Sequence, residues 1–212
     1  MKKGKLLSLL LAAVVGAGSL AMTAQAAPAE LPAQTAKTAA FVKASDWVLK
    51  DDWAIFALGR NQEEGCEKLY EDYYQGVLAL LADPAKLIPS DYIRLSLSLT
   101  AIGIDPRNIE GNDLLEKIDQ ADREMYFKMS TSSLAYALAL MERYPDSFSG
   151  TLKEDTIQKI LGAQQADGSF DYTVGGGYPD PDSTAQAMQG LMLLGDTYAS
   201  EIQAAVDWLK AQ

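Results

Sequence analysis

Four segments of the chain begin with a polar residue and continue as a run of small and apolar residues. Their first residues are spaced about 40 to 50 positions apart, which is the range of helical-hairpin repeats. Each run is apolar on nearly every face, as is typical of a helix enclosed by other helices. The segments are residues 52–58, 91–99, 130–140 and 182–191. The pattern predicts an all-α protein built from helical hairpins.

The segments between these runs are amphipathic. In residues 66–82 apolar side chains recur at helical spacing and charged side chains fill the other face, and residues 156–164 follow the same pattern. Both segments are predicted to be outer helices with one buried stripe. Residues 94–99 alternate between polar and apolar, which is a strand pattern, but their place in the repeat favours a buried helix.

The N-terminus has the features of a secretory signal peptide. Lysines precede an apolar stretch over residues 6–22, and residues 24–26 read Ala-Gln-Ala, a typical cleavage sequence. We therefore expect a signal peptide over residues 1–26, cleaved after Ala26, with an uncleaved membrane anchor as the alternative. Residues 27–37 are rich in Ala, Pro and Thr and are expected to form a flexible leader.

Charge and composition exclude several classes of function. The formal net charge is −11, and removing the three lysines of the signal peptide, which has no acidic residue, gives −11 − 3 = −14. Such a chain repels nucleic acid and anionic lipid, and it suits a secreted or cell-surface location. No later segment is long and apolar enough to insert into a membrane. The sequence has no histidine, which excludes Ser-His-Asp hydrolysis, and its single cysteine excludes an internal disulfide.

A Gln-x-x-x-Gly-x-Phe motif precedes the last of the four runs. It consists of Gln164, Gly168 and Phe170, and it is followed by an acidic loop with Asp180 and Asp182. We interpret the motif as structural: Gly168 supplies a turn, Phe170 packs beneath it, and Gln164 bonds to neighbouring backbone groups.

These residues resemble motifs of the terpenoid cyclase and protein prenyltransferase superfamily. The glutamine motif resembles the QW repeat of squalene and related cyclases with Phe in place of Trp, and residues 180–185 resemble their D-x-D-D-T-A motif. Other stretches are similar to exported bacterial prenyltransferase-like proteins of the cell surface; these are residues 45–47, 52–54, 99–106, 111–115 and 182–188. The resemblance implies an α/α toroid over residues 38–212.

The toroid is expected to be partial. A complete ring of this superfamily has about a dozen helices, whereas this chain has room for about nine of ordinary length. In addition, residues 208–212 repeat the pattern of residues 160–164 and stop at a glutamine. We therefore expect the ring to be open, or to continue past Gln212.

The two aspartates of the acidic loop are the candidate catalytic residues. The resemblance aligns Asp182 with the general acid of class II cyclases, with Asp180 as its neighbour, but Ser183 replaces the aspartate that follows it in those enzymes. The preferred interpretation is that Asp182 is the N-cap of a helix. A calcium site with Asp167 and Asp171 is a further alternative, although we expect neither a metal site nor a cofactor.

Five aromatic residues are candidates for ligand binding. They lie near the starts of the predicted inner helices or in the turn before one, which in a toroid border the central cavity. They are Trp53, Tyr92, Tyr136, Phe170 and Tyr178. Rings in such a cavity would hold an apolar or ring-shaped molecule; cobalamin is one candidate, because its carriers contain a toroid domain. The alternative is ordinary packing of the core and its rim.

The function expected from the sequence is that of an exported, non-catalytic module that binds a ligand or a protein partner at the cell surface. The alternative is a class II terpene cyclase-like enzyme that uses Asp182 as general acid. A polysaccharide lyase is a third reading, for which Arg94 and Arg123 are the basic candidates.

Overall fold

The protein is all-α in the part of the chain that the structure describes. This computed structural model describes residues 31–212, and in that range the β structure is limited to isolated bridges. The α-helices are α2 (Leu31–Lys43), α3 (Asp52–Arg60), α4 (Glu67–Leu81), α5 (Pro89–Ala101), α6 (Leu114–Asp119), α7 (Arg123–Phe127), α8 (Thr131–Arg143), α9 (Leu152–Leu161), α10 (Pro181–Met192) and α11 (Ala199–Lys210). Short 3₁₀ turns are η1 (Val48–Lys50), η2 (Pro84–Lys86), η3 (Pro145–Ser147) and η4 (Gly195–Tyr198).

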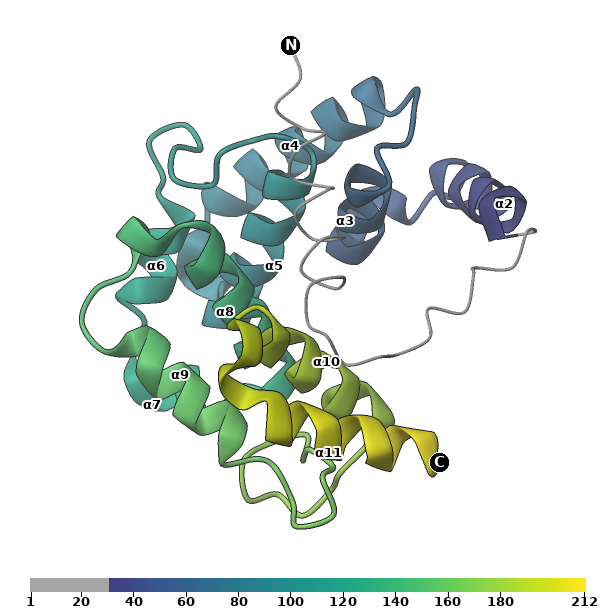
Figure 1. Ribbon diagram of the computed structural model, residues 1–212. Helices are drawn as coiled ribbons and strands as arrows, with labels where there is room; N and C mark the ends of the chain where they lie inside the picture. Colours follow the sequence, from purple (N-terminus) through teal and green to yellow (C-terminus); the bar gives the residue numbers. More distant parts are fainter. Residues whose placement is uncertain (1–30) are drawn as a thin grey trace.

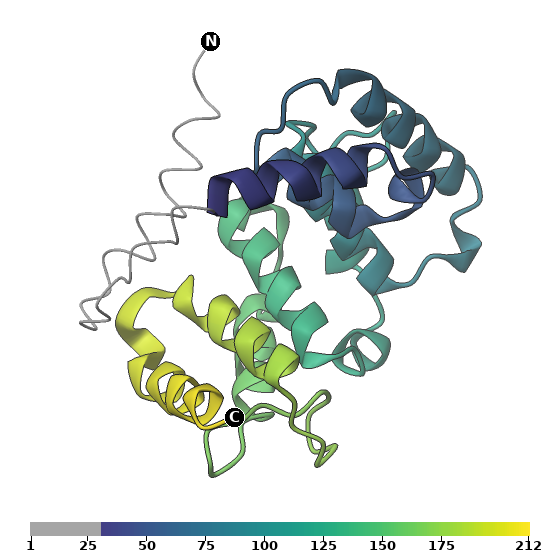
Figure 2. The same ribbon diagram turned by 90° about the vertical axis from the view of Figure 1, so that its right-hand side faces the viewer.

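The four runs of the sequence form helices that pack on one another in chain order. Helix α3 packs on α5, α5 on α8, and α8 on α10, while α9 contacts α8 and α11 contacts α10 (Figure 1). In Figure 2, α10 lies between α8 and α11. The core follows this series and includes fully buried side chains from the successive helices, such as Ile55, Leu99, Leu138 and Leu191. Burial of these apolar surfaces stabilises helices that are too short to persist alone.

Helix α5 forms despite its strand-like alternation. The small side chains of Ser96 and Ser98 are fully buried, and Ser98 contacts the start of α3. The Ser98 hydroxyl donates to the carbonyl oxygens of Asp52 (2.7 Å) and Arg94 (3.0 Å), and Thr100 donates to the carbonyl oxygen of Ser96 (2.7 Å). Because the hydroxyls of Ser98 and Thr100 bond to backbone carbonyls, these two polar positions enter the core at low cost. The Ser96 hydroxyl is buried without a partner. The predicted buried helix is confirmed.

The glutamine motif has the structural role expected of it. The Gln164 side chain donates to the carbonyl oxygens of Gly168 (3.2 Å) and Glu201 (2.9 Å), so it joins the turn to the start of α11. Gly168 has φ +95°, and a Cβ there would lie 2.4 Å from the carbonyl oxygen of Ala204. Glycine is therefore required both for the backbone conformation and for the close contact with α11.

The N-terminal boundary differs from the expectation. The leader predicted over residues 27–37 is helical from Leu31, because α2 begins there and extends to Lys43. Helix α2 is joined to the turn after α3 by an ion pair between Lys43 and Glu63 (2.8 Å), and Ala39 is buried in the core. The predicted signal peptide lies outside the described residues.

Two glycines in helices lead to opposite predictions. A Cβ on Gly59 of α3 would lie 2.8 Å from the carbonyl carbon and oxygen of Ala101, whereas a Cβ on Gly76 of α4 would meet nothing within 4 Å. We expect Gly59→Ala to lower the free energy of unfolding by about 1–3 kcal/mol because the helices must separate. Gly76→Ala should raise it by about 0.5–1 kcal/mol through helix propensity. Chemical denaturation of the three proteins measures both effects, and equal effects of the two substitutions would contradict the close approach of α3 and α5.

Candidate functional site

Asp180, and not Asp182, is the N-cap of α10. The Asp180 carboxylate accepts a hydrogen bond from the backbone N–H of Ser183 (2.8 Å), and Pro181 is the first helical residue. Proline suits that position because it has no N–H to satisfy there. The predicted cap at Asp182 is therefore wrong by two residues. Asp182 lies in the first turn of the helix with an exposed side chain, whereas a proton donor for an alkene needs a buried carboxylic acid.

The five predicted ligand-binding aromatics do not form one site. Phe170 is fully buried in the core, where its N–H donates to the Thr184 hydroxyl (2.9 Å). Tyr178 is exposed in the loop before α10. Tyr92 lines a cavity of about 360 Å³ beside α4 and α6. The structure brings together only Trp53 and Tyr136, whose ring centroids lie 4.6 Å apart.

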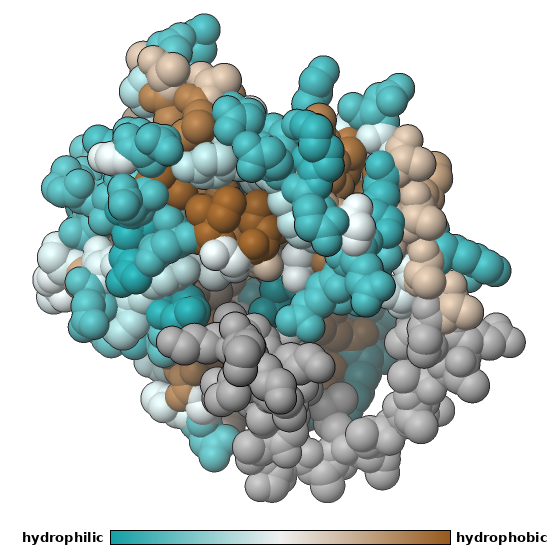
Figure 3. All heavy atoms as spheres, turned by 90° about the horizontal axis from the view of Figure 1, so that it is seen from above, coloured by the Kyte–Doolittle hydropathy of each residue, from teal (hydrophilic) through white to brown (hydrophobic). Residues whose placement is uncertain are grey.

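A second cavity, of about 410 Å³, lies between α3, α4, α5 and η1; we call it the α3–α5 cleft. Its apolar lining consists of Leu49, Val77, Leu80, Leu87 and Leu95, and its polar lining consists of Lys50, Asp52, Tyr73, Asp91 and Arg94. Leu80 and Leu49 are 50% and 41% exposed. Exposed apolar side chains between polar ones are also visible on the face shown in Figure 3.

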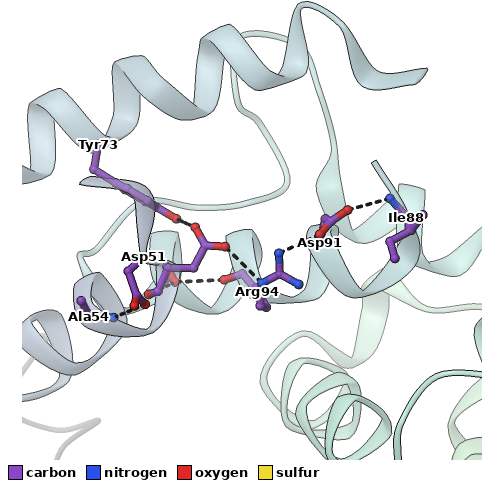
Figure 4. A network of polar contacts seen from close by, with 8 residues as sticks. Asp51, Ala54, Tyr73, Ile88, Asp91 and Arg94 are labelled. Atoms are coloured by element: carbon purple, nitrogen blue, oxygen red, sulfur yellow. Dashed lines mark hydrogen bonds and ion pairs between the residues drawn. The ribbon is translucent and has the colours of Figure 1, made fainter. Parts of the chain in front are cut away.

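The polar end of the cleft is a network centred on Asp52. The Asp52 carboxylate accepts from the Tyr73 hydroxyl (2.8 Å) and from Nε of Arg94 (3.2 Å), and Nη2 of Arg94 donates to Asp91 (2.7 Å). Figure 4 shows Tyr73 reaching down from α4 towards the groups of α3 and α5. The network thus joins one residue of α3, one of α4 and two of α5.

Consecutive aspartates explain how Asp52 reaches this network. Asp51 is the N-cap of α3 and accepts from the N–H of Ala54 (3.0 Å) (Figure 4), which leaves the Asp52 carboxylate to accept from Tyr73 of α4 and Arg94 of α5. At the start of α5, the Asp91 carboxylate accepts from the N–H of Ile88 (2.9 Å) as well as from Arg94. Each aspartate thus stabilises a helix start, and two of them also hold Arg94.

The electrostatics of the network favour binding over proton transfer. Burial raises the pKa of Tyr73, and the negative charge of Asp52 raises it further, so the phenol stays neutral and acts as a donor. Burial lowers the pKa of Arg94, but the carboxylates of Asp91 and Asp52 together outweigh this effect, so the pKa is raised. Of the five polar lining residues, Lys50 alone has a side chain without a hydrogen bond or ion pair within the described residues.

Sequence reasoning missed this site, although two signals pointed to it. Asp52 and Asp91 both start inner runs, and Arg94 follows Asp91 at the i,i+3 spacing of neighbours on a helix. The contribution of Tyr73 from α4 had no signal in the sequence. Arg123, the other basic candidate, is exposed on α7. Within residues 31–212, no group of three or more His, Cys, Asp or Glu side chains is arranged to hold a metal ion.

Comparison with known proteins found no relative of this chain. No family model, curated protein or solved structure matches the chain. Among residues 31–212, none of the helices has the length and apolar character needed to cross a bilayer.

The two aspartates of the acidic loop should differ in their effect on stability. Asp180→Ala should lower the free energy of unfolding by about 1 kcal/mol, because the N–H of Ser183 loses its acceptor. Asp182→Ala should cost about 0.5 kcal/mol or less, since it removes only a charge near the N-terminus of the helix. Urea denaturation of both variants tests the assignment of the cap, and a larger loss for Asp182→Ala would refute it.

Tyr73 should have a pH-dependent effect on stability. At pH 7, Tyr73→Phe should lower the free energy of unfolding by about 1–3 kcal/mol, because Asp52 loses a donor. The folded state raises the pKa of Tyr73 above its ordinary value of 10.0. The contribution of Tyr73 to the free energy of unfolding is therefore fully present below pH 10 and is lost as the pH rises further. The difference between the two proteins should therefore narrow above pH 10. Tyr178→Phe, at an exposed side chain, is the control that should match wild type at pH 7.

Proposed function

We propose that the protein is an exported, non-catalytic binding module and that the α3–α5 cleft is its ligand site. The observation that carries the proposal is the lining of the cleft: five leucine and valine side chains face an end whose carboxylates and guanidinium already satisfy one another. Such an end offers oriented hydrogen-bonding groups without an uncompensated buried charge. An apolar wall with a few fixed polar groups is typical of small-molecule sites.

The lining defines the class of ligand. Asp52, Asp91, Arg94 and Lys50 have formal charges that sum to zero, so the ligand is an uncharged amphipathic molecule with an apolar body and a hydroxyl or amide end. The cavity of about 410 Å³ falls in the range of drug-sized molecules. Cobalamin, with its macrocycle and nucleotide arm, is much too large to enter it.

The packing order of the helices supports a partial α/α toroid as the fold of this module. Helices α3, α5, α8 and α10 contact one another in sequence, and α9 and α11 each contact one of them. In a toroid, inner helices follow one another around the ring and outer helices cover them, and the order of these contacts supports such an arrangement. Export and a cell-surface location rest on the features of residues 1–26 and on the acidic composition.

The alternative function, a class II terpene cyclase-like enzyme, has less support. Its general acid would be Asp182, which is exposed and therefore lacks the low-dielectric surroundings that keep a carboxylic acid protonated. The absence of histidine from the whole chain removes the commonest general base.

A matched pair of surface substitutions tests the cleft as the ligand site. Leu80 lines the cleft and Met125 lies on α7, and each is 50% exposed, so arginine can replace either without entering the core. Binding of the neutral fluorescent probe Nile red should weaken by about tenfold or more in Leu80→Arg, which places a charge on the apolar wall, and should be unchanged in Met125→Arg. Mass spectrometry of small molecules retained by each protein from a cell extract would identify the natural ligand. Equal probe binding and retention by all three proteins would exclude the cleft.

A further inference from the structure

A cluster of aromatic rings lies outside the cleft. The Trp53 and Tyr136 rings meet at 4.6 Å between centroids with 47° between their planes, and Phe56 lies edge-on to Trp53 at 6.0 Å and 87°. Trp53 and Phe56 belong to α3 and Tyr136 to α8, two helices that both pack on α5. Trp53 is 37% exposed and the other two rings are partly exposed. None of these residues lines the α3–α5 cleft.

A carboxylate without a partner accompanies these rings. Asp182 is exposed at the start of α10, and its carboxylate has no hydrogen bond or ion pair to any other described residue. Its negative charge reaches Tyr136, whose pKa is raised first by burial and then by this charge. Nearby, α8 and α10 pack closely, since a Cβ on Gly190 would lie 2.9 Å from the Cβ of Ala135.

We propose that Trp53, Tyr136 and Asp182 form a binding site for a small organic cation with a quaternary or tertiary ammonium group. The faces of tryptophan and tyrosine rings attract cations through their quadrupoles, and a methylated ammonium also buries its methyl groups against them. The carboxylate adds a direct charge interaction, and the net charge of −11 concentrates cations around the protein. Helix packing alone would explain the contact between Trp53 and Tyr136, but it makes no use of the unpaired carboxylate at the start of α10, the helix that packs on α8.

Choline and its neutral isostere 3,3-dimethylbutan-1-ol test this site. The chain has three tryptophans, so the indole N–H signals in an NMR titration report on Trp53 directly, while the signal of Trp208 in α11 is an internal control. We expect choline to shift the Trp53 signal saturably and the alcohol to leave it in place. Asp182→Asn should weaken choline binding by about fivefold or more, Tyr136→Leu should abolish it, and Tyr136→Phe should retain it.

The outcomes distinguish this site from the cleft. They also distinguish between two sources of the cation. Leu80→Arg should bind choline like the wild type, so loss of Nile red binding with intact choline binding separates the two sites. Vesicles of phosphatidylcholine that shift the Trp53 signal more strongly than free choline would identify a lipid head group as the source of the cation, whereas an effect of free choline alone indicates a soluble one. An equal response to choline and to the alcohol, or unchanged choline binding in folded Asp182→Asn, would overturn the proposal.

Discussion

The close approach of helices within the series α3, α5, α8 and α10 is the constraint on which the rest of the structure depends. Gly59 leaves α3 in near contact with the backbone of Ala101 at the end of α5, and Gly190 does the same for α10 against Ala135 of α8. Because a single methyl group would force these helices apart, their spacing is set by the absence of side chains. The buried core forms between helices held at this distance, and so do the polar contacts that link them.

The network around Asp52 follows from that spacing. With α3 close to α5, the Asp52 carboxylate comes within reach of Arg94, and Tyr73 completes the arrangement from α4. The same three helices leave the α3–α5 cleft beside the network. Each charged group in the network has a partner, which makes the polar end of the cleft a rigid surface and a poor place for proton transfer.

Sequence patterns predicted the helices well and the functional groups poorly. The four apolar runs all form helices, and the structural role of Gln164 and Gly168 is confirmed, because turn chemistry and helical periodicity are local properties. The cap of α10 was misplaced by two residues, because two acidic residues stand near the start of that helix. At α3, which also has two acidic residues at its start, Asp51 caps the helix and the Asp52 carboxylate accepts from Tyr73 and Arg94.

The sequence by itself determined the all-α fold class and excluded catalytic mechanisms that need histidine. The sequence alone contains the helical periodicity, the spacing of the runs and the absence of histidine. Tertiary structure alone decided which side chains share a site: it placed Tyr73, 21 positions from Asp52, against its carboxylate, and brought Trp53 to Tyr136. It also separated Phe170 and Tyr92 from them. The reason is that such sites depend on distances between helices, and those distances come from packing across the whole core.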